Sequence, residues 1–197
     1  MTQSAPPSDP KAPVSGARRA LLALVGLGAA AGGAWWAMRR SAPPATTPDA
    51  SAATAGEPLP AGFWAQQFDT PAGTPLALSG FQGKPLLLNF WASWCGPCVK
   101  EMPELDHFHQ AFQAQGGQVL GLAIDGPTPV KAFLAKTAVG FPIGLAGLGG
   151  TELAAAMGNT AGVLPFTVMV NAQGRIVQRK LGATTLDELN GWAKTLG

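Results

Sequence analysis

Residues 86–101 read LLLNFWASWCGPCVKE, and this stretch decides the fold. It opens with an apolar run that has the length and composition of a buried strand and ends just before Ser93. Beyond Cys98, apolar side chains recur at nearly helical spacing, at Val99, Met102, Leu105, Phe108 and Phe112. The sequence therefore predicts a buried strand that leads into a helix, with Cys95 and Cys98 at the junction.

This junction favours reactive sulfur. A cysteine at a helix N-terminus lies beside unpaired backbone N–H groups and the positive end of the helix dipole, and both favour the thiolate. Gly96 leaves the surroundings of the sulfur open, and Pro97 is tolerated in a first helical turn. We expect a redox dithiol with Cys95 as the exposed attacking sulfur and Cys98 as its more buried partner.

Three other interpretations of the pair remain open from the residues alone. A structural disulfide that closes so short a loop stabilises by only about 2 kcal/mol. A zinc site is the second, and it needs ligands besides the two cysteines. The candidates His107 and His109 are two residues apart on the helix, so their side chains point in different directions. We expect both to lie on a solvated face. Chance spacing is the third. The sequence favours the dithiol and predicts no metal site.

The WCGPC motif of residues 94–98, placed after an apolar strand, resembles thioredoxin. Its continuation through residue 103 is more similar to the TlpA/ResA branch, which consists of membrane-tethered extracytoplasmic thiol–disulfide oxidoreductases. The resemblance runs from about residue 63 to the end. It implies an α/β thioredoxin-like fold: a central mixed β-sheet flanked by helices, with an N-terminal β-hairpin and an inserted helix and strand.

The resemblance also implies roles for residues on the predicted helix. Cys95 attacks a disulfide and Cys98 resolves the mixed disulfide. Thioredoxin has a buried acid in its central strand, where this chain has Asn89, whereas the TlpA/ResA branch has a glutamate at the position of Glu101. A partly desolvated carboxyl has a raised pKa and can exchange protons with a thiol, so we assign Glu101 to proton handling for Cys98. A solvent-facing helix glutamate is the plain alternative.

Pro165 is the second anchor of the predicted site. By its residues alone it could be an ordinary strand start. In thioredoxin-like folds a cis proline at this place faces the dithiol, and the backbone of the preceding residue pairs with bound substrate. The resemblance therefore implies a cis bond before Pro165 and places Leu164 beside Cys95.

The remaining site predictions concern the surface around the sulfurs. Trp94 is expected to form a flat contact surface, and Gly96, Pro97 and Leu164 complete the predicted substrate-binding residues. Asp125, at a strand end, is expected to cap a loop.

Composition limits the function classes. The chain has 197 residues, a net charge of +2 and only 12% charged residues. This composition does not indicate a nucleic-acid-binding surface. Both of its cysteines lie in the motif, so no disulfide framework reports the compartment.

The N-terminal region predicts the location. Residues 1–17 lack an apolar period and are expected to be disordered. Within residues 18–40, an uncharged stretch from Ala20 to Met38 is long enough to cross a bilayer. We expect a single-pass inner-membrane anchor with the domain facing the periplasm or cell exterior. Cleavage of a signal peptide, leaving a soluble periplasmic protein, is the alternative. Residues 41–60 form a Pro/Ala-rich linker to a domain at 61–197.

Hydrophobic patterning and turn signals predict the other elements. We expect strands at 63–68, 74–78, 119–125, 141–145, 168–170 and 175–181, and helices from 127, at 151–157 and at 186–196.

Together these observations predict a thiol–disulfide oxidoreductase outside the cytoplasm, with the Cys95–Cys98 disulfide as its redox group and no added cofactor. Gly-Pro between the cysteines is the dipeptide of thioredoxin, whose potential of about −270 mV favours a reductant. The resemblance implies a membrane thiol carrier as electron donor, and clients in cytochrome c maturation or copper/oxidase assembly. A copper metallochaperone, a peroxiredoxin-like peroxidase and an oxidase of secreted proteins are the alternatives.

Overall fold

The structure is a computed structural model that describes residues 56–196. Within these residues no helix is long and apolar enough to cross a membrane. The predicted disordered segment 1–17, the predicted anchor or signal segment 18–40 and most of the predicted linker lie outside the described residues.

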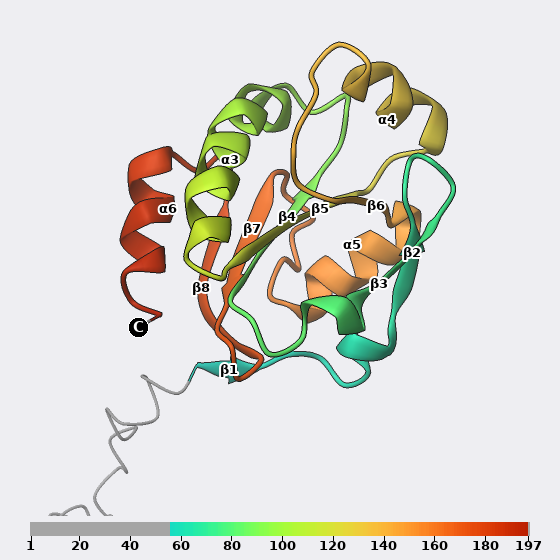
Figure 1. Cartoon of the computed structure of the whole chain (residues 1–197). Helices are drawn as coiled ribbons and strands as arrows, with labels where there is room; N and C mark the ends of the chain where they lie inside the picture. The colour runs from blue at the N-terminus through green and yellow to red at the C-terminus, as the bar shows by residue number, and fades with distance from the viewer. Residues whose placement is uncertain (1–55, 197) are drawn as a thin grey trace, which may run out of the picture. The chain divides into compact units, whose positions relative to one another are not determined.

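An eight-stranded sheet in the order β1-β8-β7-β4-β5-β6-β2-β3 forms the centre of the domain (Figure 1). Strand β4 (Leu86–Trp91) runs parallel to β5 (Gln118–Ala123), which runs parallel to β6 (Ile143–Leu145). On the other side of β4, β7 (Phe166–Val170) and β8 (Arg175–Leu181) are antiparallel to their neighbours. The sheet is therefore mixed, as predicted.

Short strands complete the two edges. The predicted N-terminal hairpin is present as β2 (Gln67–Asp69) and β3 (Pro75–Ala77), and β2 pairs with β6. At the opposite edge β1 (Glu57–Pro58) pairs with β8, so the sheet takes in residues that the sequence assigned to the linker. The prediction of a strand over 63–68 was partly wrong, because η1 (Phe63–Ala65) is a 3₁₀ turn.

Helices cover both faces of the sheet (Figure 1). Helix α3 (Gly96–Ala114) lies beside α6 (Leu186–Ala193) on one face, and α4 (Pro127–Leu134) contributes Val130 to the same core. The other face carries α5 (Gly147–Ala156), which starts four residues before the prediction, and the 3₁₀ turn η2 (Leu78–Phe81). Helix α4 and strand β6 are the predicted insertion.

Strand β4 explains why this arrangement is stable, because all six of its residues are buried. Alternate side chains enter opposite cores: Leu87 and Trp91 pack on the α3 side, and Leu88 and Phe90 on the α5 side. The strand is thus fixed from both faces, and the chain leaves its carboxyl end in a defined place just before the cysteines.

Candidate active site at the start of helix α3

The two cysteines lie where the chain passes from the end of β4 into the start of α3, as the sequence predicted. Cys95 is the N-cap residue of α3, and its sulfur accepts a hydrogen bond from the backbone N–H of Cys98 at 3.3 Å. The two residues form a disulfide with a Cα–Cα distance of 5.3 Å. Cys98 is fully buried, as predicted, but the prediction of an exposed Cys95 was wrong, because Cys95 is also buried at 6% exposure. The same N–H and the helix dipole stabilise negative charge on the Cys95 sulfur after reduction.

The carboxylate of Asp125 accepts hydrogen bonds from the turn that immediately precedes Cys95. Both the backbone N–H and the hydroxyl of Ser93 donate to one oxygen of Asp125, and the other oxygen accepts from the N–H of Gly126 at 2.8 Å. The backbone N–H of Cys95 closes the turn on the carbonyl of Ala92 at 3.1 Å. The prediction that Asp125 caps a loop is confirmed, and its partner is the turn before the active-site helix.

Glu101 lies one turn beyond Cys98 and is 3% exposed, so it is not a solvent-facing glutamate. Its Oε1 accepts a hydrogen bond from Asn89 Nδ2 at 2.8 Å. Its Oε2 accepts from the backbone N–H of Thr184 at 2.7 Å and from the Thr184 hydroxyl at 3.1 Å. Strand β4, helix α3 and the segment before α6 therefore meet at this carboxyl.

Burial raises the pKa of Glu101 above its ordinary value. The hydrogen bonds from Thr184 and Asn89 and the positive charge of Lys180 act in the opposite direction, but desolvation of the carboxylate dominates. A raised pKa makes the carboxylate a stronger base than that of an exposed glutamate, so Glu101 takes up a proton more readily and can pass it on.

Sequence reasoning named Glu101 but not the residues that hold it. Asn89 donates through the same amide nitrogen to Thr167 Oγ1 at 3.0 Å, and its own Oδ1 is buried without a hydrogen-bond partner among residues 56–196. The available signal was polarity at buried positions, since Asn89 and Thr167 stand in otherwise apolar strands. Thr184 is 83 residues from Glu101, and no local pattern links the two.

Pro165 immediately precedes β7, and the Leu164–Pro165 peptide bond is cis, as predicted. Phe90 pairs with Phe166 across β4 and β7, so Pro165 lies at the end of the sheet where β4 leads toward Cys95. The Pro165 carbonyl accepts from the N–H of Gly182 at 2.8 Å. Between residues 56 and 196, no hydrogen bond uses the backbone N–H or carbonyl of Leu164.

The surface around the sulfurs contains exposed apolar groups. Trp94 is 70% exposed, Gly96 and Pro97 are exposed, and Val163 is 41% exposed beside Leu164. An exposed tryptophan next to a reactive sulfur offers a flat apolar surface to another protein chain.

The prediction that His109 lies on a solvated face was wrong. His107 is exposed, but His109 is 8% exposed and packs edge-on against Phe141, with 6.0 Å between ring centroids. The loop before β6 covers it, because Asp106 accepts a hydrogen bond from the N–H of Gly140 at 2.5 Å. Among the residues that the structure describes, no three His, Cys, Asp or Glu side chains gather as a metal site would require.

Comparison with known proteins fits this geometry. The sequence profile of the family described as Redoxin matches residues 48–194, which is most of the chain. The chain belongs to the Redoxin family. Curated relatives include the thiol-disulfide oxidoreductase ResA of Bacillus anthracis, 29% identical over 105 residues, which are 53% of this chain and 58% of that protein. ResA of Bacillus subtilis (strain 168) is 30% identical over 47% of this chain and 50% of its own length. The chain therefore spans little more than half the length of the curated relatives it matches.

Solved structures match a larger share of this Redoxin domain. A thioredoxin-related protein from Neisseria meningitidis serogroup B is 32% identical, with a TM-score of 0.58 over 66% of this chain and 96% of that one. A secreted Mycobacterium tuberculosis disulfide oxidoreductase homologous to E. coli DsbE is 26% identical, with a TM-score of 0.57 over the same shares. These likenesses support the thioredoxin-like fold.

Proposed function

We propose that this protein is an extracytoplasmic thiol–disulfide oxidoreductase that reduces disulfides in client proteins. The observation that carries the proposal is the disulfide at the start of α3, with Cys98 fully buried and Cys95, at 6% exposure, next to the exposed Trp94. The relatives described as thiol-disulfide oxidoreductases support the same reaction class.

The proposed reaction transfers two electrons in two steps. The Cys95 thiolate attacks one sulfur of the client disulfide, which forms a mixed disulfide and releases the other client sulfur as a thiolate. The Cys98 thiolate then attacks the Cys95 sulfur, re-forms the Cys95–Cys98 disulfide and releases the second client thiolate. The client gains two electrons and, once both thiolates are protonated, two protons.

Glu101 serves the second step. Cys98 is fully buried, so water cannot readily take its proton, and Glu101 is a buried carboxyl one turn away on the same helix. Its raised pKa suits it to accept the Cys98 proton during resolution and to return it when the disulfide is reduced again. Protein hydrogen bonds to both of its oxygens fix its position.

Client binding uses the groups beside Cys95. We assign the unpaired backbone N–H and carbonyl of Leu164 to strand-like pairing with the client, next to Pro165. Trp94, with Gly96 and Pro97, supplies the apolar contact. This mode recognises extended backbone around a disulfide rather than one particular side chain.

The electron donor, the clients and the location complete the proposal. A reductant outside the cytoplasm needs electrons from a membrane thiol carrier, and the predicted anchor at residues 18–40 would hold the domain near it. The proposed clients are proteins of cytochrome c maturation or of copper and oxidase assembly. The Mycobacterium tuberculosis relative is described as secreted, which supports an extracytoplasmic location here.

Trapping tests the exchange mechanism. Cys98→Ser leaves the attacking sulfur without its resolving partner, so clients should accumulate as mixed disulfides on Cys95 that dithiothreitol releases. Cys95→Ser is the matched control and should trap none. A Cys98→Ser protein that forms no mixed disulfide with any protein disulfide would contradict the proposal.

The direction of electron flow needs its own measurement. We expect the reduction potential of the Cys95/Cys98 pair to lie near about −270 mV, and a value above about −150 mV would make the protein an oxidant instead. Stoichiometric retention of copper by the reduced protein would favour the metallochaperone alternative. Rapid turnover of peroxide would favour the peroxidase.

A further inference from the structure

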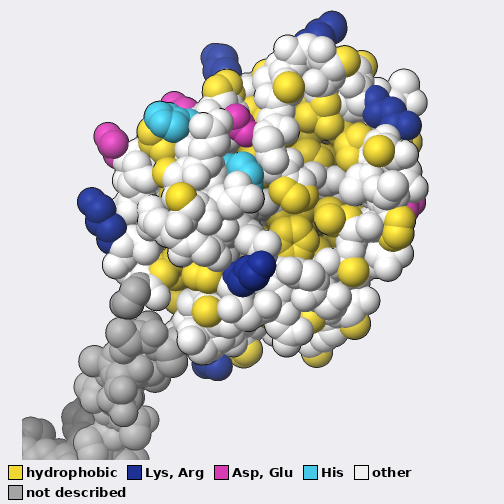
Figure 2. Space-filling model, viewed as in Figure 1, with side chains coloured by type: hydrophobic (Ala, Val, Ile, Leu, Met, Phe, Trp, Pro, Cys, Tyr) yellow, Lys and Arg dark blue, Asp and Glu magenta, His cyan; other side chains and the backbone are white. Residues whose placement is uncertain are grey.

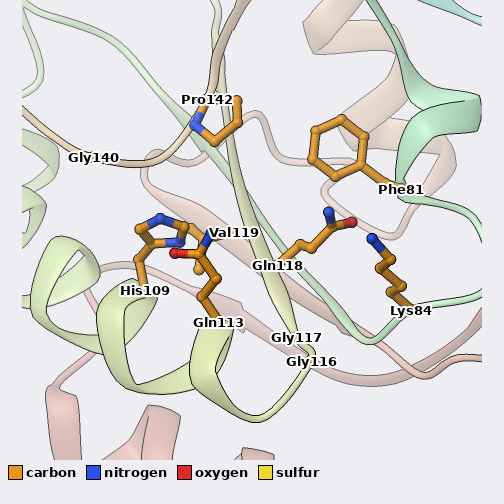
Figure 3. A pocket seen from close by; sticks show the side chains of 10 residues that line it. All are labelled: Phe81, Lys84, His109, Gln113, Gly116, Gly117, Gln118, Val119, Gly140 and Pro142. Atoms are coloured by element: carbon orange, nitrogen blue, oxygen red, sulfur yellow. The ribbon is translucent and has the colours of Figure 1, made fainter.

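A cavity of about 340 Å³ lies at the other end of α3 from the cysteines (Figure 3). Its walls come from the C-terminal half of α3, the start of β5, the end of η2 and the loop before β6. Gln113 lies 15 residues after Cys98 on the helix, which places this wall of the cavity about 22 Å from the dithiol. It is thus a separate feature from the active site. On the face shown in Figure 2, apolar side chains line a hollow with a histidine and a Lys or Arg side chain at its border.

Two buried polar atoms in the wall of this cavity have no hydrogen-bond partner. They are His109 Nδ1 and Gln118 Oε1, and they make up half of the four such side-chain atoms found in residues 56–196. His109 is more than nine-tenths buried, and Figure 3 shows both side chains at the cavity. Because an unpaired buried polar group is unfavourable, native proteins rarely keep two of them in one place without a partner.

The charged residues that line the cavity indicate the sign of the charge that a ligand would carry. Among the described residues that line the cavity, Lys84 is the one Lys or Arg, and none is Asp or Glu. The two ion pairs within the described part of the chain are Arg179–Glu57 and Lys180–Glu188, so neither involves Lys84. Asp106, one turn before His109, is bonded to Gly140 and Gln110 and does not line the cavity.

We infer that this cavity binds a small organic carboxylate that also carries a hydroxyl or ammonium group, such as a 2-hydroxy acid. Lys84 provides the charge for the carboxylate, and Gln118 Oε1 accepts from the hydroxyl or ammonium donor. His109 Nδ1 forms a hydrogen bond with the same ligand. The ligand has both hydrogen-bond donors and acceptors, so it can pair with Nδ1 in either tautomer of the imidazole. Phe81, Val119 and Pro142 supply the apolar floor. The volume is at the lower end of the range for small-molecule sites.

Titration of the ¹⁵N-labelled full-length protein with L-lactate tests the inference. We expect a dissociation constant of about 1 mM or below, which a ligand of this size reaches in a well-formed site. The side-chain amide resonances of Gln118 and Gln113 should shift on binding. Propionate, which lacks the hydroxyl donor, should bind about tenfold more weakly.

Three variants connect binding to the named groups. Lys84→Met and Gln118→Leu should each weaken lactate binding about tenfold, whereas Lys131→Met, which removes an exposed lysine on α4, should not change it. The amide spectrum shows whether each variant is folded. Gln118→Glu offers a carboxylate of the same size and should also lose lactate if Gln118→Leu proves unstable. Cys98→Ser should bind lactate normally, because the cavity does not depend on the redox reaction.

Three outcomes would overturn the inference. Absence of lactate binding would show that the cavity holds water only. Equal affinity for lactate and propionate would remove the role of Gln118. Binding of inorganic phosphate as strong as that of lactate, and insensitive to Gln118→Leu, would indicate an adventitious anion at Lys84.

Discussion

Glu101 and His109 lie eight residues apart on α3, and both are more than nine-tenths buried. Near the dithiol, Glu101 accepts three hydrogen bonds from the protein, and both of its oxygens are satisfied. At the far end, His109 has a buried nitrogen that finds no hydrogen-bond partner in the described part of the chain. The same helix therefore carries one buried polar group whose hydrogen bonds the protein satisfies and one whose hydrogen-bonding capacity is unused.

Burial of a polar group therefore does not by itself identify its role. A fully partnered carboxyl is held in one geometry, which suits repeated proton transfer to a fixed neighbour. An unpartnered group in the wall of a cavity has unused hydrogen-bonding capacity, which suits reversible binding of a ligand.

The largest effect is expected on the rate of exchange. Glu101→Gln keeps the size of the side chain but removes the titrating carboxyl, so resolution of a mixed disulfide at neutral pH should slow about a hundredfold. Stopped-flow measurement of client release from the Cys95 mixed disulfide reports that step. Glu104→Gln, an exposed position on the same helix, is the matched control and should leave the rate within about threefold, the usual spread of such effects. An unchanged rate in Glu101→Gln would end the proton-handling assignment.

A second effect concerns stability near the dithiol. Asn89→Leu removes the donor to Glu101 Oε1 and leaves a buried carboxyl oxygen without a partner, so the free energy of unfolding should fall by about 2 kcal/mol. Urea denaturation of the oxidised proteins measures it. Asn190→Leu, on α6, removes an amide with no side-chain hydrogen bond in the described structure and should change little. Equal losses in the two variants would mean that the network around Glu101 adds no stability.

Much of the fold followed from the sequence because it depends on local patterns. The apolar run of β4 and the turn signals around β8 gave strands where the structure has them, and Thr185 caps α6 through a capping box with Glu188. The 3₁₀ turn at Phe63–Ala65 was missed, because its sequence reads equally well as a strand start. The pairing of Glu57–Pro58 with β8 was missed, because a two-residue edge strand has no pattern of its own.

The site divides in the same way. The cysteine pair is local in sequence, and so is the spacing from Cys98 to Glu101. The contacts that bury Glu101 come from residues 12 and 83 positions away, and those that bury His109 come from the loop before β6. Helical periodicity placed His109 toward solvent because it cannot include a segment that folds back over the helix.

A third prediction follows from the pKa of Glu101. Because burial holds the folded-state pKa above the unfolded value of about 4.3, the stability contributed by this group is fully present below that value. It is lost as the pH rises through the folded pKa. The stability of the wild type relative to Glu101→Gln should therefore decrease from pH 4 upward and then level off. Urea denaturation across this range measures it, with Glu152→Gln on α5 as a control for loss of an exposed carboxyl. A relative stability that rises with pH would contradict the raised pKa.

The smallest effect lies at the far end of α3 and has the opposite sign from that of Asn89→Leu. His109→Leu replaces a buried ring that has an unpaired nitrogen with an apolar side chain of similar volume, so the free energy of unfolding should rise by about 1 kcal/mol. His107→Leu, at an exposed position two residues away, is the matched control and should give no such gain. Saturating lactate should narrow the difference, because a ligand bound only to the folded wild type adds to its stability. A loss of stability in His109→Leu without ligand would show that the imidazole is already partnered, and the contrast with Glu101 would then fail.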